Sequence, residues 1–185
     1  MLETLTQDLL TRAQNGDPTI IGDLYDRYRL NVFRYLFYRL GDIHAAEDLT
    51  SEVFLRMMRS LPNYKITGVP FEAWLFQIAR NLAIDHYRKV NRGEQISLED
   101  EMQADRIDEP DHNLERNITS DLLVRALAKL DDVQRDVIVL RFVNGLPIAQ
   151  VALTIHRSEN AIKALQHRAL ASLRETLIEW EITYA

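Results

Sequence analysis

Polar and basic side chains recur along one face of a predicted helix near the C-terminus. They are Asn160, Lys163, Gln166, His167 and Arg168. Amide, ammonium and guanidinium groups bind base edges and phosphate oxygens of DNA. The opposite face carries Ile162, Leu165, Ala169, Leu170 and Leu173, and their three- and four-residue spacing predicts that this face is buried. The segment therefore combines DNA-binding chemistry with an apolar face that can pack on a core.

The residues before this helix predict how it is positioned. Gly145 ends the preceding helix, and Pro147 suits the first position of a short helix that runs to about Thr154. Ser158 is expected to cap the second helix through its hydroxyl. A short helix, a tight turn and a longer helix with a basic outer face form the helix-turn-helix pattern, whose second helix enters the DNA major groove. His156 stands in the turn, where a positive φ usually favours Gly; an ordinary helical hairpin is the alternative interpretation.

A second polar cluster occupies the last two turns of a helix expected from Pro70 to about Val90. It consists of Arg80, Asn81, Asp85, Arg88 and Lys89. Cations at this end suit the helix dipole, so a solvated helix face is one interpretation. The other is a DNA site, in which Asn and Asp bond to an unstacked base and the cations hold phosphates. The loop 62–70 before this helix adds Asn63, Tyr64 and Lys65.

Composition excludes several classes of protein. The chain has 185 residues, of which 46% are hydrophobic, and it contains no cysteine. Disulfides and thiolate zinc sites are therefore excluded. No apolar run reaches the roughly 18 residues that a membrane span needs, and the N-terminus lacks the order of a signal peptide. We expect a soluble, cytoplasmic protein with no membrane insertion.

The net charge of −6 lies entirely in one segment. Residues 1–90 hold eleven acidic and eleven basic side chains, and residues 113–185 hold nine of each. Residues 91–112 hold eight acids against two arginines. This segment has high charge and low hydrophobicity, so we interpret it as an acidic flexible linker. Its carboxylates could reach the basic faces around Arg88 and Arg168 and hold the two flanking domains together.

Helical periodicity dominates both flanking segments. The first contains expected helices over about 5–14, 19–40, 42–61 and 70–90, and the second contains four more up to residue 173 and beyond. No strand pattern of useful length occurs. The sequence therefore predicts an all-α protein with two small helical domains, 1–90 and 113–185, joined by the linker 91–112.

Two long motifs now resemble one family. The stretches AAEDLTSEVFLRMMRSL (Ala45–Leu61) and PFEAWLFQIARNLAIDHYRK (Pro70–Lys89) resemble region 2 of the sigma factors of bacterial RNA polymerase. The stretch from Leu127 to Arg174 resembles region 4 of the same family. The chain is similar to the small two-domain type, called extracytoplasmic-function sigma factors. Ser51, Asp131, Gln150 and His156 depart from the usual Gln, Pro, Glu and Gly of the family.

The resemblance implies roles for the two domains. Residues 1–90 would bind core RNA polymerase and the −10 promoter element, and residues 113–185 would bind the −35 element. The expected −10 residues are Asn63, Tyr64, Lys65, Arg80, Asn81, Asp85, Arg88 and Lys89. The expected −35 residues are Arg157, Ser158, Asn160, Lys163, His167 and Arg168. The expected polymerase-binding residues are Asp48, Ser51, Glu52 and Leu55.

Other functions remain as alternatives. A helix-turn-helix regulator that binds duplex DNA without polymerase would share the C-terminal motif, but it would have no use for the helix 70–89. Glu52 could instead pair with Arg56 along its own helix. An enzyme is not indicated, because the five histidines are scattered and no catalytic motif occurs. We expect no catalytic residue, metal or cofactor; the expected partners are core RNA polymerase and promoter DNA, with an anti-sigma factor as a further candidate.

Overall fold

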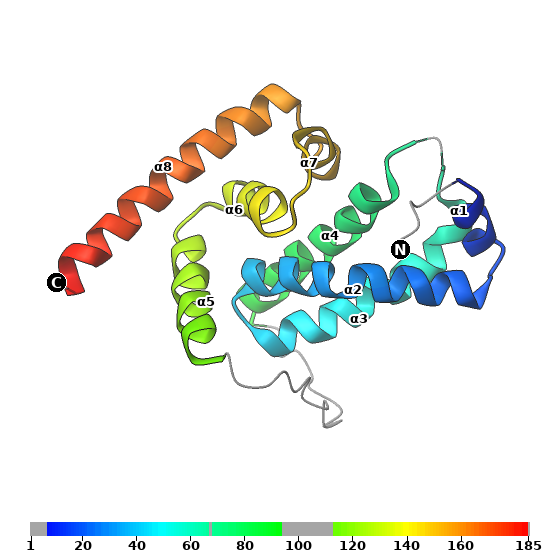
Figure 1. The fold of residues 1–185 in the computed structure, drawn as a ribbon, viewed down its shortest axis with the longest axis horizontal. Coiled ribbons are helices and arrows are strands. Elements are labelled where there is room, and N and C mark those ends of the chain that lie inside the picture. The colour runs from blue at the N-terminus through cyan, green and yellow to red at the C-terminus, as the bar shows by residue number, and fades with distance from the viewer. Residues whose placement is uncertain (1–6, 67, 94–112, 185) are drawn as a thin grey trace.

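The computed structural model describes residues 7–66, 68–93 and 113–184, of which 113–120 and 181–184 are described by their backbone alone. These residues form helices and connecting turns without any strand (Figure 1). The prediction of an all-α fold is confirmed. The helices are α1 (Gln7–Gln14), α2 (Pro18–Leu40), α3 (Ile43–Ser60), α4 (Phe71–Asn91), α5 (Asn113–Ala128), α6 (Asp132–Ile138), α7 (Ile148–Ile155) and α8 (Glu159–Tyr184).

Aspartates begin three of these helices. Asp17 accepts hydrogen bonds from the backbone N–H groups of Thr19 and Ile20, and Asp42 accepts one from Ala45. Asp131 accepts one from Gln134 at 2.8 Å. A side-chain oxygen at this position satisfies a donor that the helix leaves without an internal partner. The helix starts predicted near Asp17, Asp42 and Asp131 are therefore confirmed.

The N-terminal half, α1–α4, packs around an aromatic core. Tyr35 and Phe76 meet edge to face with their ring centroids 5.6 Å apart, and both are fully buried. In helix α3, Ala46, Thr50, Val53, Phe54 and Met57 are buried, whereas Ala45 and Leu49 are only half-buried.

The C-terminal half, α5–α8, contains the predicted helix-turn-helix as α7 and α8. Helix α6 continues into a π-helical turn, η2 (Val139–Val143), before Gly145. Pro147 precedes α7 as its cap rather than forming its first residue. Leu170 was expected to be buried but is 42% exposed; between Glu159 and Trp180, the buried residues of α8 are Ile162 and Ala169.

The two halves are in direct contact. Helix α7 packs on α4, and α5 and η2 pack on α2. Gln77 donates a hydrogen bond to the carbonyl of Leu153 at 2.9 Å, and Asn144 donates one to the carbonyl of Asn31 at 2.7 Å. At Gly41 the approach is close, since a Cβ there would lie 3.2 Å from Val124 Cγ1. Of the predicted linker, residues 94–112 lie outside the described part of the chain, so its role in this contact stays a prediction.

No helix among the described residues is both long enough and apolar enough to cross a membrane. The long α8 has charged and polar side chains along its whole described length. Figure 1 shows α8 extending away from α2 and α4 towards the C-terminus.

The backbone conformation of His156, in the turn between α7 and α8, predicts how a substitution there changes stability. His156 adopts φ 59° and ψ 51°, the left-handed conformation in which a Cβ is disfavoured. We expect His156→Gly to raise the free energy of unfolding by about 0.5–1 kcal/mol, measured by urea denaturation. His156→Ala is the control, because alanine keeps the Cβ; equal stability of the two variants would contradict the account.

Candidate nucleic-acid interface

The outward face of α8 carries three of the predicted −35 residues in one stripe. Asn160, Lys163 and His167 follow one another at three- and four-residue spacing, and all three are exposed. Ile162 and Ala169 lie on the opposite side and are fully buried. The hydroxyl of Ser158 accepts a hydrogen bond from the backbone N–H of Ala161 at 3.2 Å, which confirms its predicted cap. The core contacts therefore fix which side of α8 faces outwards.

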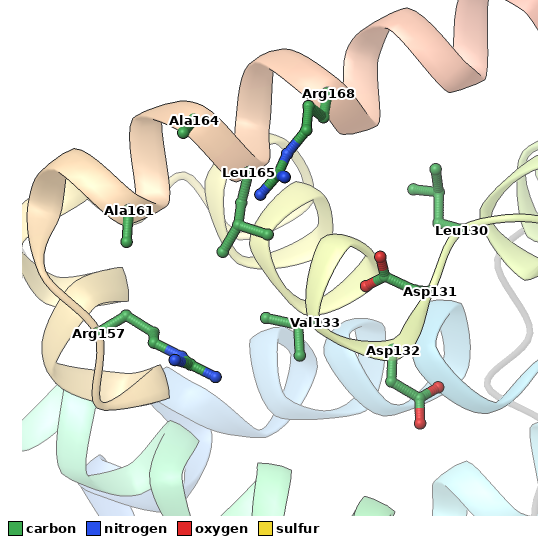
Figure 2. A pocket seen from close by; sticks show the side chains of 9 residues that line it. All are labelled: Leu130, Asp131, Asp132, Val133, Arg157, Ala161, Ala164, Leu165 and Arg168. Atoms are coloured by element: carbon green, nitrogen blue, oxygen red, sulfur yellow. The ribbon is translucent and has the colours of Figure 1, made fainter.

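Arg157 and Arg168 lie along a different side of the helix-turn-helix. With Ala161, Ala164 and Leu165 they line an open cleft of about 840 Å³ between α8 and the start of α6. The far wall of this cleft holds Leu130, Asp131, Asp132 and Val133, as Figure 2 shows. The structure thus separates the predicted −35 residues into an outward stripe and a pair of arginines that line a cleft together with Asp131 and Asp132.

The predicted −10 residues on α4 are mostly exposed. Asn81, Asp85 and Arg88 follow one another at spacings of four and three residues, and Lys89 is next to them. Asp85 and Arg88 lie 3.8 Å apart at their closest charged atoms, which is a loose pair on the surface. These side chains are accessible to a ligand in this conformation of the protein.

In the loop before α4, two of the three residues expected to contact DNA are exposed and one is buried. Asn63 and Lys65 are exposed, but Tyr64 is buried. Its hydroxyl donates to the carbonyl of Val69, and its ring lies 4.7 Å from that of Trp74, centroid to centroid. Burial also raises the pKa of Tyr64. Tyr64 thus holds the loop in place, and its ring is not accessible in this structure to stack on a base.

Among the predicted −10 residues on α4, Arg80 is the least exposed, although it was expected on the outer face of the helix. Only 16% of its side chain is exposed, and its Nε donates to Asp136 Oδ2 at 2.8 Å. Asp136 belongs to α6 in the C-terminal half and is completely buried. Helix α6 therefore covers the edge of the predicted −10 face that Arg80 occupies.

Two further groups from α2 reach the same carboxylate. Tyr35 donates from its hydroxyl to Asp136 Oδ1 at 2.9 Å, and Arg39 donates from Nε to the same oxygen at 2.8 Å. The side chain of Arg39 is fully buried, and its guanidinium carbon lies 4.9 Å from the ring centroid of Tyr87. We name Tyr35, Arg39 and Arg80, which all belong to the N-terminal half, the three-donor cluster.

The electrostatics of this cluster follow from burial and from the charge of Asp136. Burial, and next the negative charge of Asp136, raise the pKa of Tyr35 well above its ordinary value, so the phenol stays protonated and donates. Burial is the largest influence on Arg39 and lowers its pKa, but Asp136, Tyr35, Asp132 and Tyr87 together outweigh it, so the pKa of Arg39 is raised. The chain therefore keeps both groups as hydrogen-bond donors.

Sequence reasoning missed Tyr35, Arg39 and Asp136. Arg39 follows the apolar run YLFY, and Asp136 precedes VIVL, so each is a charge beside an apolar stretch. A buried charge is retained only when it is paired. This pattern indicates that each residue belongs to a buried ion pair, but it does not identify the residue of opposite charge.

The predicted polymerase-binding face lies along α3. Asp48, Ser51 and Leu55 are exposed, and Glu52 is half-buried. Glu52 Oε1 accepts a hydrogen bond from Arg56 Nε at 2.8 Å, so the intrahelical pair considered above is present. The exposed Met58 extends this face by another turn, at 43% exposure. Its use by polymerase stays a prediction.

Comparison with known proteins identifies the family. The model of sigma-70 region 2 matches residues 24–93, and that of sigma-70 region 4 matches residues 126–175. The ECF RNA polymerase sigma factor ShbA of Streptomyces griseus is 36% identical over 184 residues, covering 92% of this chain and 94% of ShbA. The chain belongs to the ECF sigma factors.

A further ECF relative is longer than this chain. The ECF RNA polymerase sigma factor BldN of Streptomyces coelicolor is 36% identical over 171 residues, covering 92% of this chain but 65% of BldN. A solved structure of CnrH in complex with the cytosolic domain of CnrY matches with a TM-score of 0.74 at 22% identity, covering 92% of this chain and 96% of CnrH. That similarity supports the fold of this ECF sigma factor.

ECF sigma factors direct transcription initiation by RNA polymerase, so the family supplies the general function. A duplex-binding regulator that acts without polymerase is not favoured, because region 2 is matched as well as region 4. The two matched regions fall on the two halves of the structure. The expectation that the chain is a sigma factor is confirmed.

Proposed function

We propose that this ECF sigma factor divides promoter recognition between its two halves. Residues 1–90 hold core polymerase and the −10 element, residues 113–185 hold the −35 element, and residues 91–112 connect them. The observation that carries this proposal is the exposure of polar stripes on two helices whose other sides are buried: Asn81, Asp85 and Arg88 on α4, and Asn160, Lys163 and His167 on α8.

At the −35 element, the outward stripe of α8 would enter the major groove. Asn160 and Lys163 are assigned to base edges, since the first turns of a recognition helix lie deepest in the groove. His167 and Arg168 are assigned to the flanking backbone, and Arg157 and Ser158 to phosphates at the entrance of the helix. Asp131 and Asp132 lie across the cleft from Arg157 and Arg168. They would keep a phosphate away from the depth of the cleft and favour contacts at its rim.

At the −10 element, the exposed side of α4 would hold an open strand. Asn81 and Asp85 offer an amide and a carboxylate for the edge of an unstacked base, and Arg88 and Lys89 offer charge to phosphates. Asn63 and Lys65, exposed in the loop held by Tyr64, are assigned to the same strand. Arg80 joins this set only when it is released from Asp136.

We propose that α3 contacts polymerase through Asp48, Ser51, Glu52 and Leu55, and that the protein works in the cytoplasm as a non-enzymatic subunit. Two of the similar solved structures are complexes, CnrH with the cytosolic domain of CnrY and RpoE with the anti-sigma factor NepR from Bartonella quintana. By analogy, an anti-sigma factor is a candidate partner of this chain.

Run-off transcription tests the proposed function. Purified chain is added to core RNA polymerase on a template that carries the promoter region upstream of its own gene. We expect a discrete transcript that is absent without the chain, because core polymerase alone does not select a promoter. Co-purification with core polymerase at moderate salt is measured in parallel. A chain that neither associates with polymerase nor yields a transcript would overturn the proposal.

Substitutions on α8 test the base-contact assignment. Asn160→Ala and Lys163→Ala should each reduce the preference for the native over a scrambled −35 sequence by about 1–3 kcal/mol, the discrimination of one good base contact. The readout is the ratio of transcripts from the two templates. Arg174→Ala is the matched control, since it removes an exposed cation further along α8; unchanged ratios in both test variants would show that the assignment is wrong.

A further inference from the structure

The three-donor cluster consists of side chains from the N-terminal half, and the carboxylate that accepts their hydrogen bonds, Asp136, belongs to the C-terminal half. The hydroxyl of Tyr35 and the Nε atoms of Arg39 and Arg80 all donate to Asp136 at 2.8–2.9 Å. Asp136 is supplied by α6, and α6 also covers the cluster. When the C-terminal half moves away, two guanidinium groups lose their shared counter-ion.

The closed arrangement does not use all the donors of this cluster. Both terminal nitrogens of Arg39 are buried and make no hydrogen bond with the described residues. Nη2 lies 3.2 Å from Asp132 Oδ1, but Asp132 is on the rim and 68% of its side chain is exposed. Nη1 is therefore a buried donor with neither a hydrogen bond nor an ion pair to the described residues, which is costly, so the cluster has capacity for an acceptor that Asp136 does not supply.

The geometry fits one chemical class of ligand. A carboxylate presents one negative charge shared by two oxygens, and so does the phosphodiester group of a nucleic-acid strand. Arginine side chains bind both groups by the same charge-assisted hydrogen bonds. Arg80 is one residue from the exposed Asn81 on α4, so the cluster adjoins the proposed path of the −10 strand.

We propose that Tyr35, Arg39 and Arg80 form a phosphate-binding site for the −10 strand, and that Asp136 fills this site in the free protein as a carboxylate stand-in. The inference rests on the proposed −10 function of α4. The same donors cannot serve both acceptors, so strand binding and domain contact exclude one another. The outward stripe of α8 and the outer side of α4 are exposed in this closed form, so closure blocks only the phosphate site and leaves the −35 stripe open.

Binding of a fluorescein-labelled oligothymidine strand to the full-length chain tests this site, because a phosphate contact does not depend on base sequence. Asp136→Asn removes the charge and retains the shape of the side chain. We expect it to tighten binding at least about tenfold, the ratio that one charge-assisted contact contributes. Asp121→Asn on α5 is the matched control, because it makes the same change in net charge at an exposed position, and we expect it to change affinity less than about twofold.

Second substitutions in the Asp136→Asn chain then locate the contact. Tyr35→Phe and Arg39→Gln should each remove most of the gain, and Arg39→Gln should reduce the slope of log affinity against log salt by about 0.7, the value for one phosphate of a single strand. A strand with neutral methylphosphonate linkages should bind wild type and Asp136→Asn equally. This last comparison needs no additional change to the protein.

The results separate the two proposals. If Asp136→Asn binds no more tightly than Asp121→Asn, or if the gain survives both second substitutions and the neutral linkages, the phosphate site is wrong. In either case, if Lys89→Ala still lowers the affinity for the oligothymidine strand, the proposed −10 function of α4 is retained. An affinity that depends on neither the cluster nor Lys89 overturns both.

Discussion

The buried carboxylate of Asp136 is the constraint on which the arrangement of the two halves depends. A charge without solvent must be neutralised and hydrogen-bonded where it lies, and Asp136 obtains both from the opposite half of the chain. Removing one partner of a buried ion pair costs about 3–5 kcal/mol, whereas the intact pair contributes little net stability. The cluster therefore specifies one docking position more than it strengthens the contact, and other contacts between the halves, such as α7 on α4, add to it.

This constraint links the fold to promoter recognition. The side of α4 that packs on α7 and bonds through Arg80 to Asp136 of α6 is adjacent to the side that carries Asn81, Asp85 and Arg88. One helix thus serves as a docking surface in the free protein and as a proposed strand-binding surface in the polymerase complex. An ECF sigma factor of this design would bring the three-donor cluster to its −10 strand only after the halves separate, while the outer side of α4 is exposed in both forms.

Local signals in the sequence predicted the elements well and the contact between them poorly. Aspartate caps, helix-ending glycines and apolar periodicity act over a few residues, so the helix starts at Asp17, Asp42 and Asp131 could be read directly. The stripe Asn160, Lys163 and His167 was predictable for the same reason. The burial of Tyr64 and Arg80 was not predicted, because it depends on Trp74 and Asp136, which lie 10 and 56 positions further along the chain. The role of the acidic linker as a latch stays a prediction; among the described residues, the carboxylates that join the halves are Asp132 and Asp136 of α6.

The most direct test of the account is the distance between the two halves in solution. The chain has no cysteine, so Ser60→Cys and Glu175→Cys, both at exposed positions, allow spin labels to be placed on α3 and α8 alone. The account predicts one narrow distance distribution for the free protein, and a longer and broader one when Asp136→Asn is introduced or core polymerase is added. An identical distribution for wild type and Asp136→Asn would contradict the central claim that this carboxylate holds the protein closed.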